Sequence, residues 1–210
     1  MTAAADPVGH QFNLNLWLGR EAGEHDDPDF ARLADALRHL QAKVAGSRPP
    51  REVALAAVRE LDALLASLVG YEVSEADQVA GRQFGLPSRG QTFLPPLVID
   101  AYDGHSVAAR VTFGRFYLGS NGAAHGGAIS LIFDDLLGQL ANGQGCPRAR
   151  TAYLHVDYRD IVPLDQDLTV TARMTRVEGR KVFIEGAILD GERVLTEAHG
   201  LFVRLEAHHR

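Results

Sequence analysis

Hydrophobic residues in the first part of the chain recur at alternating steps of three and four. The pattern lies between Asp27-Pro28, which suits the start of a helix, and Gly46, which suits its end. A similar stripe lies between Pro49-Pro50 and Gly70. The sequence therefore predicts two amphipathic helices in a hairpin, whose apolar stripes must bury each other or dock elsewhere. The first stripe is Phe30, Leu33, Leu37, Leu40 and Val44, and the second is Ala54, Val58, Leu61, Leu65 and Leu68.

The hydrophobic period changes from 3.6 to 2 after a Gly/Pro-rich stretch at residues 81–96. Residues 106–113 alternate as expected for a strand with one buried face. Residues 128–141 are apolar on nearly all sides, which predicts a helix enclosed by other elements. Further alternating segments predict strands at Thr151–Tyr158, Leu168–Val177, Lys181–Leu189 and Arg193–Leu205, with hairpin turns at Glu178-Gly179 and Asp190-Gly191. An α+β fold, with one antiparallel sheet wrapped around one helix, satisfies this order.

Composition narrows the class of protein. The net charge is −6 over 210 residues, and the scattered Lys and Arg form no basic stripe, so nucleic acid is not expected as a partner. No apolar run approaches the roughly 18 residues that a bilayer span needs, so no membrane span is expected. The single Cys146 and the lack of a signal-peptide pattern predict a cytoplasmic protein. No His/Cys spacing typical of a metal site is present, and no cofactor is expected.

Two acidic residues, Asp134 and Asp135, interrupt the apolar helix. A carboxylate in an apolar site costs several kcal/mol unless it is paired, hydrogen-bonded or protonated. Successive residues lie 100° apart on a helix, so one acid can face a site while the other faces solvent or a subunit contact. The spacing does not say which acid does which.

The start of the same helix offers a different chemistry. Unpaired backbone N–H groups and the positive end of the helix dipole lie there, and Gly126 and Gly127 let an anion or carbonyl oxygen approach closely. This describes an oxyanion hole, beside which a carboxylate attacks a carbonyl carbon or deprotonates water. Gly126 and Asp134 are eight residues apart, about 12 Å along the axis. Because one helix cannot bring both to one carbonyl, the sequence predicts a homodimer with shared sites.

The segment from His125-Gly126-Gly127 to Asp134 resembles the helix signature of PaaI-like acyl-CoA thioesterases of the hotdog-fold superfamily. The strand Thr151–Arg159 and the later Gly179-Arg180 also match that family. The resemblance covers Val98 to Leu205 and implies three segments: an N-terminal helical extension at 1–97, a hotdog domain at 98–205 and a tail at 206–210. It also implies hydrolysis of an acyl-CoA to a free acid and coenzyme A, in fatty acid metabolism.

The resemblance assigns roles to individual residues. Asp134 becomes the nucleophile or general base, and the Gly126 amide becomes the oxyanion donor. His125 would brace the loop before the helix, Thr151 would position the attacking water or the carboxylate, and Asn121 would supply a second polar contact to the thioester oxygen. The predicted substrate-binding residues are Gly127, where no Cβ intervenes, and Arg159, Arg180 and Lys181, whose charges suit the phosphates of coenzyme A.

Two other functions stay open. One is an acyl-CoA-binding or sensing module that keeps the fold without turnover. The other is a hotdog hydratase or dehydratase acting on enoyl thioesters, which needs a paired His and acid, and His125 and Asp134 lie nine residues apart. Acyl chain preference and the pairing of dimers into a homotetramer are likewise not fixed by the sequence.

Overall fold

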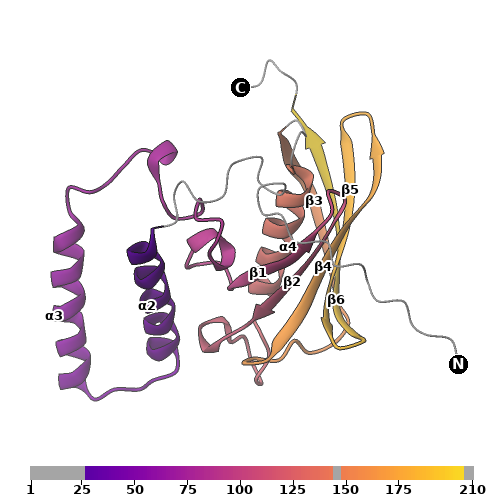
Figure 1. Cartoon of the computed structure of the whole chain (residues 1–210). Coiled ribbons are helices and arrows are strands. Elements are labelled where there is room, and N and C mark those ends of the chain that lie inside the picture. Colours follow the sequence, from indigo (N-terminus) through magenta and orange to yellow (C-terminus); the bar gives the residue numbers. More distant parts are fainter. Residues whose placement is uncertain (1–26, 144–147, 206–210) are drawn as a thin grey trace, which may run out of the picture.

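The computed structural model describes residues 27–143 and 148–205, so Cys146 and the predicted tail at 206–210 lie outside the described residues. Three helices and six strands make up most of the described chain (Figure 1). Three short 3-10 turns, η1 (Glu75–Asp77), η2 (Pro87–Gly90) and η3 (Arg115–Tyr117), lie between them. The helices and strands are α2 (Pro28–Ala45), α3 (Arg51–Leu68), β1 (Leu97–Tyr102), β2 (Ser106–Thr112), α4 (Gly126–Ala141), β3 (Ala149–Tyr158), β4 (Asp167–Glu178), β5 (Lys181–Asp190) and β6 (Arg193–Arg204).

The six strands form one antiparallel sheet in the order β1-β2-β4-β5-β6-β3. Helix α4 lies along one face of this sheet (Figure 1) and contacts β3, β4, β5 and β6. The predicted α+β arrangement is therefore confirmed. Strand β1 was not predicted, because a bulge between Ile99 and Ala101 breaks the alternation of buried and exposed positions. It begins at Leu97, one residue before the predicted domain start.

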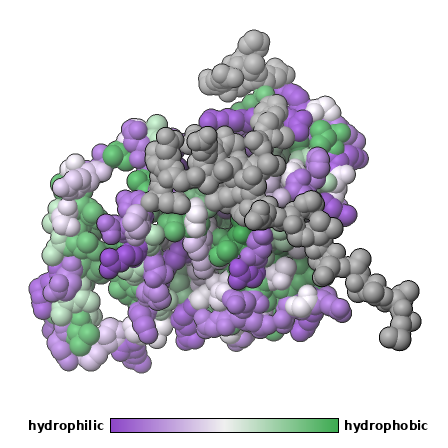
Figure 2. Space-filling view, viewed as in Figure 1, coloured by the Kyte–Doolittle hydropathy of each residue, from purple (hydrophilic) through white to green (hydrophobic). Residues whose placement is uncertain are grey.

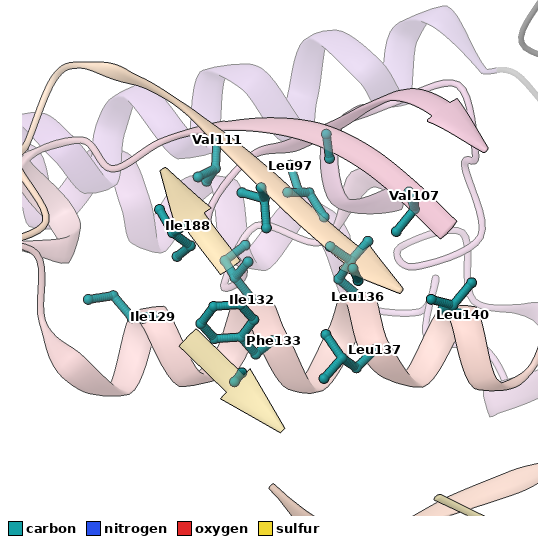
Figure 3. Packing of buried hydrophobic residues seen from close by; sticks show 14 of the residues in the cluster. Leu97, Val107, Val111, Ile129, Ile132, Phe133, Leu136, Leu137, Leu140 and Ile188 are labelled. Carbon is teal, nitrogen blue, oxygen red and sulfur yellow. The ribbon is translucent and has the colours of Figure 1, made fainter. Parts of the chain in front are cut away.

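The core lies between α4 and the sheet. Five large side chains of α4 are fully buried and point into it (Figure 3), namely Ile132, Phe133, Leu136, Leu137 and Leu140. Two glycines let the sheet come close to the helix. A Cβ at Gly186 would lie 3.0 Å from Leu137, and one at Gly200 would lie 3.2 Å from Leu137 and 2.7 Å from Phe202. This close packing fixes α4, and with it any chemistry that the helix carries.

The two N-terminal helices form where predicted, but their apolar stripes stay largely uncovered. Asp27 caps α2 by accepting hydrogen bonds from the Asp29 and Phe30 amides, at 2.9 and 3.1 Å. Helix α2 meets the rest of the chain through Ala34, its one buried residue, and through Arg38, which donates to the carbonyls of residues 91 and 94. No residue of α3 is buried. Apolar residues are visible on the surface over both helices (Figure 2).

Residues 81–96, named the strap below, connect these helices to β1. Ser88 and Arg89 both have left-handed backbones, with φ of 48° and 56°. Each such residue costs about 1–3 kcal/mol unless its surroundings hold it in place. Here the Ser88 hydroxyl donates to the Pro95 carbonyl at 2.6 Å and accepts from the Leu97 amide at 3.0 Å, so the strap is tied to the first strand.

None of the helices among the described residues is long and apolar enough to cross a membrane.

Candidate active site

Asp134 lies exposed on α4, and Thr151 of β3 contacts it. The Thr151 hydroxyl donates to Asp134 Oδ1 at 3.2 Å. A bulge between Thr151 and Tyr153 shifts the pairing of β3 with β6, and Thr151 lies opposite the fully buried Phe202. The bulge thus turns Thr151 toward the helix side of the sheet. The structure therefore brings together two of the predicted catalytic residues.

Asp135 has a different environment from its neighbour. Arg89 of the strap donates two hydrogen bonds to it, from Nη1 to Oδ2 at 3.1 Å and from Nη2 to Oδ1 at 2.7 Å. Gln139 also donates to Asp135 Oδ2, at 2.7 Å. The Arg89 and Asp135 side chains are only 19% and 14% exposed. Asp135 therefore fastens the strap to α4, and Asp134 is the acid of this pair that is open to a substrate.

His125 caps the start of α4. Its Nδ1 accepts a hydrogen bond from the Gly127 amide at 2.9 Å, so the ring proton is assigned to Nε2. The His125 carbonyl accepts from the amides of Ala128 and Ile129, at 2.9 and 3.2 Å. Among the described residues, the Gly126 amide has no hydrogen-bond partner. Of the two glycine amides at the helix start, that of Gly126 is thus available to an oxyanion. That of Gly127 is engaged, and its predicted substrate contact stays a prediction.

Tyr158, at the end of β3, lies over the helix start and was missed by the sequence reasoning. Its hydroxyl donates to the Gly126 carbonyl at 2.9 Å and lies 2.9 Å from the Ser130 hydroxyl. A Cβ at Gly126 would lie 3.2 Å from this hydroxyl, so any larger residue there would have to displace Tyr158 slightly. The available signal was the alternation of β3, which places Tyr158 on the same face as Leu154 and Val156, two residues packed against the core.

Asn121 occupies a tight turn. Asn121 and Gly122 have φ of 52° and 77°, and the Ala123 amide donates to the Ser120 carbonyl at 2.9 Å. Two successive residues with positive φ define a type I′ turn, for which Asn-Gly is the favoured pair. Backbone geometry accounts for Asn121, and its contact with a thioester oxygen stays a prediction.

The predicted phosphate-binding cations are divided between the two ends of β3. At its C-terminal end, Arg159 donates to Glu197 at 2.8 Å and lies 3.4 Å from Asp157, and the hydrogen bond to Glu197 together with both negative charges raises the pKa of Arg159. At its N-terminal end, Arg150 and Lys181 both pair with Val203 of β6, and the Arg204 amide donates to the Arg180 carbonyl. Arg180 and Lys181 thus come together beside two further cations, Arg150 and Arg204, which the sequence reasoning did not single out.

Comparison with known proteins shows that part of this chain is similar to thioesterases. The family model of the thioesterase superfamily matches residues 121–197. The mouse acyl-coenzyme A thioesterase THEM4 is 37% identical over 90 residues, which is 42% of this chain and 38% of the mouse protein. The Xenopus laevis THEM4 is 35% identical over 94 residues, 44% of this chain and 42% of that protein. The chain therefore spans about two fifths of the length of these curated relatives.

A solved structure extends the match beyond that region. The crystal structure of protein RHA08564, a thioesterase superfamily protein, aligns with a TM-score of 0.69 and 28% identity. It covers 83% of this chain and 94% of that protein, and thus more of this chain than the family model does. The predicted hotdog architecture is confirmed by this match and by the sheet and helix described above.

Proposed function

We propose that the protein hydrolyses acyl-CoA thioesters to a free acid and coenzyme A, because residues 121–197 match the family model of the thioesterase superfamily. The observation that carries the proposal is the geometry of α4. Its exposed Asp134 carboxylate is held by Thr151, and its N-terminal Gly126 amide is free of partners among the described residues. The curated relatives, acyl-coenzyme A thioesterases, support the choice of substrate class.

In the proposed reaction, Asp134 removes a proton from water, and the resulting hydroxide attacks the thioester carbonyl carbon. The carbonyl oxygen becomes negatively charged and accepts a hydrogen bond from the Gly126 amide, where the helix dipole also favours negative charge. Collapse of the tetrahedral intermediate breaks the carbon–sulfur bond and releases coenzyme A. Thr151 would orient the Asp134 carboxylate for this step.

Direct attack by Asp134 on the carbonyl carbon is the alternative route and would form a mixed anhydride. Water then attacks the anhydride, and where it attacks the aspartyl carbon the water oxygen stays in the Asp134 carboxylate while the acid product leaves. A single turnover in ¹⁸O-labelled water detects attack at the aspartyl carbon of the anhydride. Label found in Asp134 by mass spectrometry would establish the anhydride route, and its absence from Asp134 is expected for the general-base route.

The site is proposed to be shared between two copies of the chain. Gly126 and Asp134 are separated by two turns of α4, about 12 Å, whereas each must come within about 3 Å of the reacting groups. Gly127 and Asp134 are also exposed, although α4 is the central helix of the fold. A homodimer in which the two α4 helices face each other would cover this surface and complete two sites.

The phosphates of coenzyme A are proposed to bind at the end of the sheet where β3 and β5 begin. Arg180 and Lys181 lie there together with Arg150 and Arg204, and Arg150 is adjacent to Thr151 in sequence. Arg159, the remaining predicted phosphate-binding cation, lies at the other end of β3, where two carboxylates hold its guanidinium. The cytoplasmic location predicted from the sequence stays a prediction.

Thiol release from a panel of acyl-CoA substrates tests the proposed function. The Asp134→Asn variant keeps the shape of the side chain and removes the base, so turnover should fall by about 10²–10⁴-fold. Asp62→Asn is a suitable control, because Asp62 is an exposed acid on α3. Tight binding of an acyl-CoA without thiol release by the wild-type protein would favour a binding module instead. An absorbance change from an enoyl-CoA without thiol release would favour a hydratase.

A further inference from the structure

We propose that Tyr158 is a positioning residue for the oxyanion hole, holding the peptide groups around Gly126 in the orientation that presents the Gly126 amide to substrate. This inference deepens the proposed function and rests on it. It is carried by three features of the helix start: the hydrogen bonds of the Tyr158 hydroxyl, the contact of its ring with Gly126, and the conformational freedom of glycine.

The direction of the hydrogen bonds follows from the chemistry of the groups. The Gly126 carbonyl is only an acceptor, so the single proton of the Tyr158 hydroxyl goes to it, across 2.9 Å. The Ser130 hydroxyl, also at 2.9 Å, must then donate to the Tyr158 oxygen. The next peptide N–H, that of Gly127, donates to His125 Nδ1. The result is a chain of donors that runs from Ser130 through Tyr158 and the Gly126–Gly127 peptide to His125, and each bond in it polarises the next.

Glycine makes such a restraint necessary. A Cβ at position 126 would crowd Tyr158, since it would lie 3.2 Å from the hydroxyl and 3.4 Å from the adjacent ring carbon. Without a Cβ, however, glycine readily adopts other φ/ψ values, and its flanking peptides are free to rotate. The peptide before Gly126 is held by the Ala128 and Ile129 amides, and the peptide after it is held by Tyr158 at its carbonyl and by His125 at its N–H. Both planes around the donor are therefore held.

The position of Tyr158 separates this role from a purely structural one. The residue is 52% exposed, so water can replace the lost hydrogen bonds of its hydroxyl and the fold loses little when that hydroxyl is removed. Orientation of a catalytic amide is more demanding, because small displacements of a donor weaken its bond to the transition state. Loss of the hydroxyl should thus affect turnover more than stability.

The test is the Tyr158→Phe variant, which keeps the ring against Gly126 and removes the hydroxyl. We expect kcat for acyl-CoA hydrolysis to fall about tenfold, with KM within about twofold of wild type and Tm within about 2 °C. Tyr153→Phe is the matched control, because Tyr153 lies on the same strand, is 49% exposed and faces the other side of the sheet, and it should leave kcat unchanged. Ser130→Ala, which removes only the first donor of the chain, should lower kcat about threefold.

Three outcomes would overturn the inference. One is an unchanged kcat in Tyr158→Phe. Another is a joint change of kcat, KM and Tm, which would indicate a structural role. The third is loss of the basic limb of the pH–rate profile, which would make Tyr158 itself a proton donor to the reaction.

Hydrogen exchange of the Gly127 amide by NMR gives a readout that does not depend on turnover. Exchange should accelerate about tenfold in Tyr158→Phe and stay the same in Tyr153→Phe, since only the first variant frees the peptide. Equal exchange in both variants would also overturn the inference. A wild-type protein that releases no thiol but shows the expected exchange would refute the proposed hydrolysis and retain the positioning role of Tyr158.

Discussion

Replacing Arg89 with alanine should lower the free energy of unfolding by about 3 kcal/mol. Arg89 and Asp135 share two hydrogen bonds, of 3.1 and 2.7 Å, and their side chains are 19% and 14% exposed. Without the Arg89 cation, the Asp135 carboxylate loses its positive partner. It keeps the hydrogen bond from the neutral amide of Gln139. Breaking a fully buried pair costs about 3–5 kcal/mol, and the slight exposure of this pair places it at the lower end of that range.

A second ion pair in the same protein provides the control. Arg110 also donates to both carboxylate oxygens of an aspartate, Asp100, at 2.8–3.0 Å, but these side chains are 57% and 38% exposed. Arg110→Ala should therefore lower the free energy of unfolding far less than Arg89→Ala does. Urea unfolding followed by circular dichroism measures both values, and a double variant, Arg89→Met with Asp135→Leu, should recover most of the loss.

The reasoning is refuted if Arg89→Ala costs no more than Arg110→Ala. It is also refuted if the double variant is as unstable as Arg89→Ala alone, because the loss would then come from the strap backbone and not from an unpaired charge. Either result would mean that the ion pair does not fasten the strap to the helix that carries Asp134.

Three further predictions concern catalysis, domain organisation and pH. Thr151→Val removes the donor to Asp134 while keeping the shape, so thiol release should fall about tenfold, whereas Thr151→Ser should stay near wild type. Deleting residues 1–89 removes Arg89 and should leave a protein that unfolds more readily, whereas deleting residues 1–74 keeps the strap and should retain a cooperative thermal transition. Partial burial acts to raise the pKa of Asp103, but hydrogen bonds from His105 and Ser106 outweigh it and lower that pKa. The resulting stabilisation is present at pH values above the ordinary carboxyl pKa of about 3.9 and is lost as the pH falls below it. The free energy of unfolding of Asp103→Asn, measured by circular dichroism, should therefore decline less steeply at acidic pH than that of the wild type.

The sequence predicts the elements of this fold well wherever a local signal marks them. The Asp27 cap and Gly46 bound α2, and the glycines of the turns at 179 and 191 have the positive φ that those turns need. Strand β1 was missed because its bulge removes the alternation, although Asp103-Gly104 marks the turn that follows it. The partial exposure of the α2 and α3 stripes depends on what each helix contacts, which periodicity does not encode.

The candidate site was predictable in part for the same reason. The family resemblance singled out Asp134 and Thr151, and their side chains lie within hydrogen-bond distance of each other. The separate fate of Asp135 depends on Arg89, 46 residues earlier in a strap with no hydrophobic period, so no local pattern could reveal the ion pair. The Tyr158 hydroxyl likewise reaches Gly126 across 32 residues, and only the three-dimensional packing of β3 on α4 brings the two together.

A complementation experiment tests the shared thioesterase site most directly. Asp134→Asn removes the base, and Gly126→Val places a Cβ 3.2 Å from the Tyr158 hydroxyl and disrupts the oxyanion donor, so each variant alone should be nearly inactive. In a mixed dimer of the two variants, one of the two shared sites receives an intact Asp134 from one chain and an intact Gly126 from the other. Refolding the variants together at equal concentrations should thus restore about a quarter of wild-type acyl-CoA turnover. No recovery beyond the sum of the separate variants, with mixed dimers verified by differently tagged chains, would contradict the shared site.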